Sequence, residues 1–196
     1  MDINKIWFSD EADFYLHGFV NRQNFRIWGT ENPHYLMERP LHPDYLTVWM
    51  AVSGCGVIKP FFFYDTVTGE RYQSMLENGF FPEAYRRGLI DEFCFQQDGA
   101  SPHRTREVKN CIRSRFHDRV IGLGFTSDEG REIVWPPHSP DLNPCDFALW
   151  GMMKDHVYRA QPESLFSLKN AIESYVNLLD GPMLERIMAK EVSHFQ

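Results

Sequence analysis

The first third of the chain contains short apolar runs separated by polar residues, a pattern typical of β-strands. The runs lie at Lys5–Ser9, Phe14–Val20, Asn24–Trp28, Tyr45–Ser53 and Val57–Tyr64, and the last two are rich in β-branched and aromatic residues. Ser53–Gly56, between those two, has the composition of a tight turn. The pattern predicts an antiparallel meander, with a polar connection between the third and fourth runs.

The hydrophobic period becomes helical after residue 70. Apolar positions in Glu70–Arg87 predict a helix that Gly79 and Pro82 interrupt. Further helices are expected over 103–116, from Pro144 to about Tyr158 with Asn143 as N-cap, and over about 163–192. Short strands at 93–95, 120–123 and 133–135 separate them. This order predicts an α/β domain whose helices flank one central mixed sheet, formed by the meander and by parallel strands.

The composition supports a single domain over residues 1–196. Of the 196 residues, 43% are hydrophobic and 24% are charged, which disfavours disorder and coiled coil. The four cysteines form no CxxC pair and no zinc-like spacing. No signal-peptide pattern opens the chain, and no apolar stretch reaches the roughly 20 residues of a membrane span. We therefore expect a protein that is neither secreted nor membrane-bound.

The charge is unevenly distributed. The net charge of -7 argues against a protein that wraps nucleic acid non-specifically, because phosphates attract a positive surface. Between residues 101 and 120, however, six Lys or Arg residues stand against two acidic ones. Arg106, Lys109 and Arg113 in this segment would share one face of the expected helix, so we expect them to contact phosphates, although such faces are commonly just solvated.

Three aspartates stand where a sheet-based fold gathers a site. Asp10 follows the run Lys5–Ser9, Asp98 follows the short strand near 95, and Asp146 lies in the first turn of the helix begun by Pro144. Carboxylates brought together repel unless a cation lies between them, and Mg²⁺ or Mn²⁺ prefer such oxygen ligands. The spacing alone is equally compatible with turn formers and partners of a helix dipole.

Three motifs around these aspartates together resemble a known family. They read FSDE at 8–11, QDGASPH at 97–103 and WPPHSPDLNPCD at 135–146. In this order they are similar to the acidic motifs of Tc1/mariner-type transposases, whose DDE/D catalytic domain has an RNase H-like fold. The resemblance extends from about Ile6 to Tyr158 and includes RIWG at 26–29 and the run at 49–54.

The resemblance implies that Asp10, Asp98 and Asp146 are the catalytic acids and hold two Mg²⁺ or Mn²⁺ ions. The implied reaction is DNA strand cleavage at transposon ends followed by strand transfer to a target. The implied partners are double-stranded DNA and a second copy of the chain, the implied compartment is the nucleus, and no small-molecule cofactor is needed. Asp141 belongs to the SPDLNP turn and is not expected to bind metal.

Three further residues near the motifs receive smaller roles. Glu11 would point to the opposite face of the strand from Asp10, so we interpret it as a structural or supporting residue. His103 would contact the DNA phosphate or cap the following helix. His138, in the proline-rich turn, would also contact DNA.

The chain departs from the family pattern in two respects. Between Asp98 and Asp146 lie 47 residues, more than is usual in the family, which predicts a longer loop at 122–132. The helix-turn-helix modules that normally precede the catalytic domain are expected to be absent, which would account for the negative charge.

Two other functions stay open at this point. The first is an inactive or domesticated remnant, nuclear or cytoplasmic, that binds nucleic acid or protein. The second is a general nuclease of the RNase H type that cleaves RNA–DNA hybrids.

Overall fold

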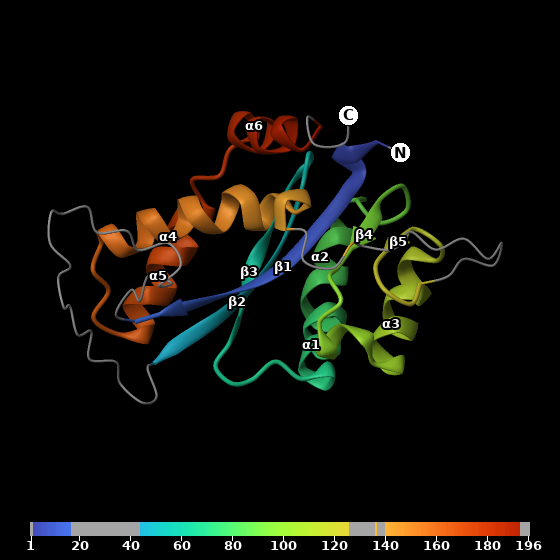
Figure 1. The fold of residues 1–196 in the computed structure, drawn as a ribbon, viewed down its shortest axis with the longest axis horizontal. Helices are drawn as coiled ribbons and strands as arrows, with labels where there is room; N and C mark the ends of the chain where they lie inside the picture. The colour runs from blue at the N-terminus through green and yellow to red at the C-terminus, as the bar shows by residue number, and fades with distance from the viewer. Residues whose placement is uncertain (1, 17–43, 126–135, 137–139, 193–196) are drawn as a thin grey trace, which may run out of the picture.

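A five-stranded mixed sheet forms the centre of the molecule (Figure 1). The computed structural model describes residues 2–16, 44–125, 136 and 140–192. The strands are β1 (Ile6–Tyr15), β2 (Tyr45–Ser53), β3 (Gly56–Phe63), β4 (Cys94–Gln96) and β5 (Val120–Ile121), and their order across the sheet is β3-β2-β1-β4-β5. β1, β2 and β3 pair antiparallel, whereas β4 and β5 join parallel to β1. The predicted combination of a meander with parallel strands is confirmed.

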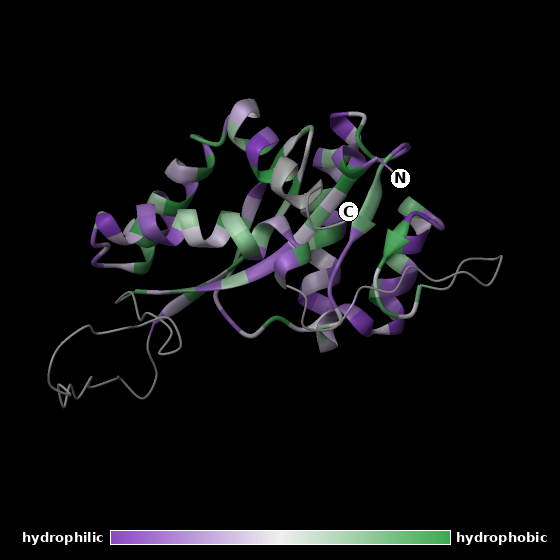
Figure 2. Cartoon of the chain, turned by 45° about the horizontal axis from the view of Figure 1, so that its top comes forward, coloured by the Kyte–Doolittle hydropathy of each residue, from purple (hydrophilic) through white to green (hydrophobic). Residues whose placement is uncertain are grey.

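β1 is longer than the sequence predicted. The apolar runs suggested one strand ending at Ser9 and a second over 14–20, but a single strand continues through Asp10 to Tyr15, and Asp10 pairs with Met50 of β2. Backbone pairing with β2 tolerates polar side chains here, and Asp13 accepts a hydrogen bond from Thr47 Oγ1 at 2.7 Å. Figure 2 shows this hydrophilic stretch within β1. The prediction that Asp10 follows the strand was therefore wrong, because Asp10 lies inside it.

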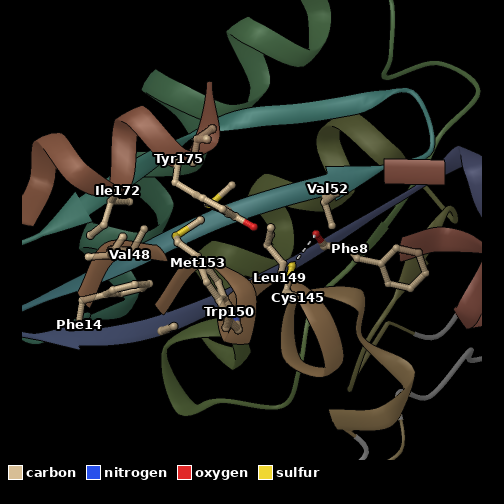
Figure 3. Packing of buried hydrophobic residues seen from close by; sticks show 14 of the residues in the cluster. Phe8, Phe14, Val48, Val52, Cys145, Leu149, Trp150, Met153, Ile172 and Tyr175 are labelled. Atoms are coloured by element: carbon tan, nitrogen blue, oxygen red, sulfur yellow. Dashed lines mark hydrogen bonds between the residues drawn. The ribbon is translucent and has the colours of Figure 1, made fainter. Parts of the chain in front are cut away.

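The sheet separates two helical layers. On one face α4 (Trp150–Arg159), α5 (Leu165–Val176) and α6 (Gly181–Val192) cover a core that includes Phe8, Phe14 and Val48 (Figure 3). On the other face α1 (Gly69–Met75), α2 (Phe81–Arg86) and α3 (Arg106–Phe116) enclose an aromatic core. Its rings include Trp7, Trp49, Phe80, Phe95 and Phe116. Alternate residues of β1 thus enter two different cores.

The helices largely follow their predicted positions. The interrupted helix near 70–87 is α1, a π-helical turn at Leu76–Phe80, and α2. The helix expected from His103 begins later, because Ser101–Arg104 forms a 3₁₀ turn and Thr105 accepts from the Val108 amide as N-cap of α3. In the ranges described, no helix is long and apolar enough to cross a membrane. The runs 24–28 and 133–135 and the loop at 127–132 lie outside the described residues.

Candidate active site

β1 presents two neighbouring carboxylates to opposite faces of the sheet. Asp10 Oδ2 accepts a hydrogen bond of 2.6 Å from Trp150 Nε1 on α4. Glu11 Oε1 lies 2.9 Å from His103 Nε2, on the side of the aromatic core. The alternation of side chains along a strand explains this division. The sequence interpretation that Glu11 points away from Asp10 is consistent with these contacts.

Asp98 lies two residues after the end of β4, the strand that pairs with β1. Phe8 pairs with Gln96, so Asp10 and Asp98 each lie two residues further along parallel neighbours, and such neighbours are about 4.8 Å apart. Ser9 Oγ donates to the Gln96 carbonyl at 2.7 Å and holds the strands together at this point. The Asp98 carboxylate accepts the Ala100 amide at 3.0 Å and lies 2.6 Å from His103 Nδ1, both through Oδ1.

Asp146 is carried by a helix start that is fastened to β1. Asn143 Oδ1 accepts the Cys145 amide at 3.0 Å, which confirms the predicted N-cap, and Asn143 Nδ2 donates to the Ser9 carbonyl at 3.3 Å. The Cys145 thiol donates to the Phe8 carbonyl at 3.8 Å (Figure 3). Cys145–Leu149 forms a π-helical turn before α4, and such turns often occur at functional sites. Asp146 itself is exposed to solvent.

The three aspartates are linked electrostatically. Burial, followed by the charges of Asp146 and Glu11, raises the pKa of Asp10 well above its usual range. Although Asp146 stays accessible to solvent, the protein around it removes part of its hydration and raises its pKa; a hydrogen bond with Asp10 partly offsets this rise, and the charge of Asp98 adds to it. These shifts have the sign expected for carboxylates gathered without a counter-ion. Asp10, Asp98 and Asp146 therefore converge on one region.

His103 is placed differently from the DNA contact that the sequence suggested. Its side chain is only 3% exposed, and both ring nitrogens contact carboxylates. Burial lowers its pKa, but Glu11 and Asp98 outweigh that effect and raise it to about 10. In turn, although burial alone would raise the pKa of Asp98, its bond to His103 brings the net shift below the usual value. The ring is thus enclosed beside the acids, where it cannot reach a phosphate.

Two residues of α4 were missed by the sequence analysis. Trp150 binds Asp10, and the Lys154 ammonium lies 5.3 Å from the centre of the Phe14 ring. Burial lowers the pKa of Lys154, against the opposing charges of Asp13, Asp10 and Asp146. A signal was present, because Trp150 and Lys154 follow Asp146 by four and eight residues and so share its face of the helix.

The remaining candidates stay predictions. Arg106, Lys109 and Arg113 all lie on α3, where Arg106 is exposed and the Arg113 guanidinium is 5.5 Å from the Phe125 ring centre. His138 lies outside the described residues. Asp141 is exposed, in the 3₁₀ turn Pro140–Leu142.

The carboxylate oxygens of the three aspartates suit a divalent cation, although in the described part of the chain they are not arranged to hold one. Among the described residues, no three His, Cys, Asp or Glu side chains are grouped closely enough to hold an ion as they stand. Carboxylate oxygens are nevertheless the ligands that Mg²⁺ and Mn²⁺ prefer. A cation would also relieve the repulsion that raises the pKa of Asp10. The chemistry of Asp10, Asp98 and Asp146 is therefore suited to such an ion.

Comparison with known proteins establishes the family of this chain. Residues 5–169 match the family model of the DDE superfamily endonucleases, and the chain belongs to that family. It is 27% identical over 191 residues to the transposable element Tc3 transposase of Caenorhabditis elegans, an alignment that covers 96% of this chain and 54% of the relative. It is 28% identical over 160 residues to the Tcb2 transposase of Caenorhabditis briggsae, covering 74% and 53%. The chain spans about half the length of these curated relatives.

Solved structures of the Mos1 mariner transposase share the fold. The catalytic domain of Mos1 superimposes with a TM-score of 0.62 at 20% identity, over 96% of this chain and 78% of that one. A Mos1 paired-end complex with Mn gives a TM-score of 0.70 at 19% identity, over 97% and 53%. These similarities confirm the RNase H-like fold, and with the relatives above they confirm a transposase catalytic domain of Tc1/mariner type.

Proposed function

We propose that this domain cleaves DNA strands at transposon ends and joins them to a target, using divalent cations held by Asp10, Asp98 and Asp146. The observation that carries the proposal is the convergence of three acids from β1, the end of β4 and the start of α4. Hydrogen bonds across 134 and 140 residues of sequence fasten the α4 segment to β1. Such long-range fastening is expected where carboxylates must keep a fixed arrangement.

The residues around the acids orient them. Trp150 holds Oδ2 of Asp10, and His103 and the Ala100 amide hold Oδ1 of Asp98. Each carboxylate then has its second oxygen to offer to a cation. When bound, divalent ions activate the attacking water or 3′-hydroxyl and stabilise the leaving oxygen.

Partners and compartment follow from the same proposal. Mos1 structures that share the fold are complexes with transposon ends, which supports double-stranded DNA as the substrate of this domain. α3 follows the 3₁₀ turn that comes after Asp98, and we propose its residues Arg106, Lys109 and Arg113 as phosphate contacts. We further propose that the chain acts in the nucleus as a homodimer that bridges two DNA ends.

The experiment is metal-dependent nicking of supercoiled plasmid by the purified chain. We expect Mn²⁺-dependent nicking by the wild type and its loss in Asp98→Ala. Asp155→Ala serves as the matched control, because Asp155 is an exposed aspartate on α4 paired with Arg159. Equal nicking by all three proteins, or nicking that persists in excess chelator, would contradict the proposal.

A second candidate function is DNA binding without catalysis. It is favoured by the observation that, within the part of the chain described, the acids do not form a metal-ready cluster. Under this alternative the wild type would bind plasmid but would not nick it at any Mn²⁺ concentration.

A further inference from the structure

His103 links two acidic residues that come from different strands. Its Nδ1 lies 2.6 Å from Asp98 Oδ1, and its Nε2 lies 2.9 Å from Glu11 Oε1. Both distances are within hydrogen-bonding range, so one ring contacts a carboxylate at each end.

The histidine ring is itself fixed from two sides. Its ring centre lies 4.2 Å from that of Tyr72, with 32° between the planes. Tyr72 donates its hydroxyl to Gln97 Oε1 at 3.1 Å, and Gln97 Nε2 donates to the His103 carbonyl at 3.2 Å. Tyr72, Gln97 and His103 are all buried. The imidazole therefore has one orientation, which Glu11 fixes at one end.

Asp98 needs such a support more than Asp10 does. Asp10 lies within β1, where it pairs with Met50 of β2, whereas Asp98 follows the end of the short strand β4. Its side chain is 44% exposed, against 16% for Glu11. Without the bridge, the Asp98 carboxylate would rotate freely at the end of the strand, held only by the Ala100 amide.

We propose that His103 is a positioning residue that, anchored on Glu11, fixes Oδ1 of Asp98 and thereby directs Oδ2 to the metal site. The inference rests on the proposed function. It also gives Glu11 a role distinct from that of its neighbour Asp10: Glu11 holds the histidine and does not bind the ion. Groups that orient metal ligands in this way typically change metal affinity by about 10- to 100-fold when they are removed.

The test measures Mn²⁺ binding to the full chain through the electron paramagnetic resonance signal of the Mn²⁺ that remains free in solution. In His103→Gln the amide reaches the position of Nε2, so contact with Glu11 is kept and contact with Asp98 is lost. In His103→Asn the amide replaces Nδ1, so contact with Asp98 is kept. We expect Mn²⁺ affinity to fall about tenfold in His103→Gln and less in His103→Asn.

The anchoring by Glu11 is tested by a double-mutant cycle. Glu11→Gln should weaken Mn²⁺ binding more in the wild type than in His103→Gln, because the part of its effect that runs through the histidine is already lost in His103→Gln, whereas its charge acts on Asp10 in both. The control Glu173→Gln, on α5, should leave Mn²⁺ binding unchanged. Circular dichroism and thermal melts on every variant separate loss of folded protein from loss of metal affinity.

The possible failures are distinguishable. A wild type that binds no Mn²⁺ overturns the proposed function, and this inference with it. Wild-type affinity in both His103→Gln and Glu11→Gln overturns this inference alone, as would effects of the two substitutions that simply add. Should His103→Gln fail to fold, His103→Asn takes its place in the cycle: the contact with Glu11 is lost there, so Glu11→Gln should weaken Mn²⁺ binding less than it does in the wild type.

Discussion

Asp10 and Asp98 are the same chemical group in opposite surroundings. Burial and the charges of Asp146 and Glu11 raise the pKa of Asp10, whereas hydrogen bonding to His103 leaves the pKa of Asp98 lowered despite partial burial. Without a metal, protons therefore favour Asp10 over Asp98. A cation bound between the acids would favour the ionised form of Asp10.

The assignment of the third acid is tested by two aspartates five residues apart. Asp146→Asn is expected to reduce Mn²⁺-dependent nicking by about 100-fold or more, because a charge that supports the transition state is lost. Asp141→Asn should nick like the wild type. Both positions are exposed, so neither substitution should lower the melting temperature appreciably. Loss of nicking in Asp141→Asn with activity retained in Asp146→Asn would reverse the assignment.

The sequence offered the three aspartates as candidates but did not reveal their contacts. Asp10, Asp98 and Asp146 were candidates because each stands in a short local motif. The bond from Trp150 to Asp10 spans 140 residues and the contact of His103 with Glu11 spans 92. Contacts of that range depend on strand order and helix placement, which no local pattern contains. His103 was accordingly expected at the DNA, although it is buried beneath the acids.

Among the elements, regular hydrophobic spacing was the dependable signal. Leu168, Ile172 and Tyr175 recur at helical spacing, and all three are buried on α5. β1 was misjudged because its middle is polar, yet strand pairing with β2 continues through it. The start of α3 was misjudged because the 3₁₀ turn before it has no apolar period to reveal it. Patterns of burial thus locate elements, while pairing and capping set their ends.

Two glycines in helical segments should respond in opposite ways to alanine. A Cβ on Gly79 would lie 2.1 Å from Cε1 of Phe61, a ring that packs against Trp49. Gly79→Ala should therefore destabilise the protein by about 1–3 kcal/mol through overpacking. A Cβ on Gly151 of α4 meets nothing within 4 Å, so Gly151→Ala should stabilise it by about 0.5–1 kcal/mol. Urea unfolding would measure both, and equal signs would contradict the packing of the π-helical turn Leu76–Phe80 against β3.

The ion pairs of α2 give a pH-dependent contribution to stability. Hydrogen bonds from Arg86 and Arg87 lower the pKa of Glu83 from 4.5 to about 2, and Arg87 also donates to the Val57 carbonyl of β3. Because the folded-state pKa is the lower one, this contribution is complete above about pH 4.5 and is lost as the pH falls toward 2. Glu83→Gln should cost about 0.5–1 kcal/mol at pH 7.

The difference in unfolding free energy between wild type and Glu83→Gln is expected to shrink steadily between pH 4.5 and pH 2. Glu173→Gln is the comparison, since its contact with Lys169 is long, at 3.9 Å. A difference for Glu83→Gln that does not change across this pH range would contradict the prediction.

In the whole molecule, the residues that contact the acids come from both faces of the sheet. Trp150 of α4 supports Asp10, and His103, which packs against Tyr72 of α1, supports Asp98. The proposed function places substrate DNA over the acids, with Arg106 and Lys109 of α3 as phosphate contacts.

Charge reversal tests that placement. Arg106→Glu combined with Lys109→Glu should weaken binding of duplex DNA and reduce the slope of log affinity against log salt by about 2, one for each lost phosphate contact. Fluorescence anisotropy at several salt concentrations would measure both quantities.

The matched control is a double variant that changes the net charge by the same amount at positions outside α3. Arg159→Glu combined with Lys169→Glu alters residues of α4 and α5 that pair with Asp155 and Glu173. The control should retain the wild-type salt slope. An equal loss in the two double variants would mean that net charge, and not the face of α3, governs binding.

Anomalous X-ray diffraction from crystals of the chain soaked in Mn²⁺ tests the central claim most directly. The account predicts anomalous peaks between Asp10, Asp98 and Asp146, with Glu11 and Asp141 outside the coordination sphere. Soaking Asp98→Ala crystals should remove or weaken at least one peak. Mn²⁺ bound elsewhere on the molecule, with Asp10, Asp98 and Asp146 free of it at saturating concentration, would contradict the account.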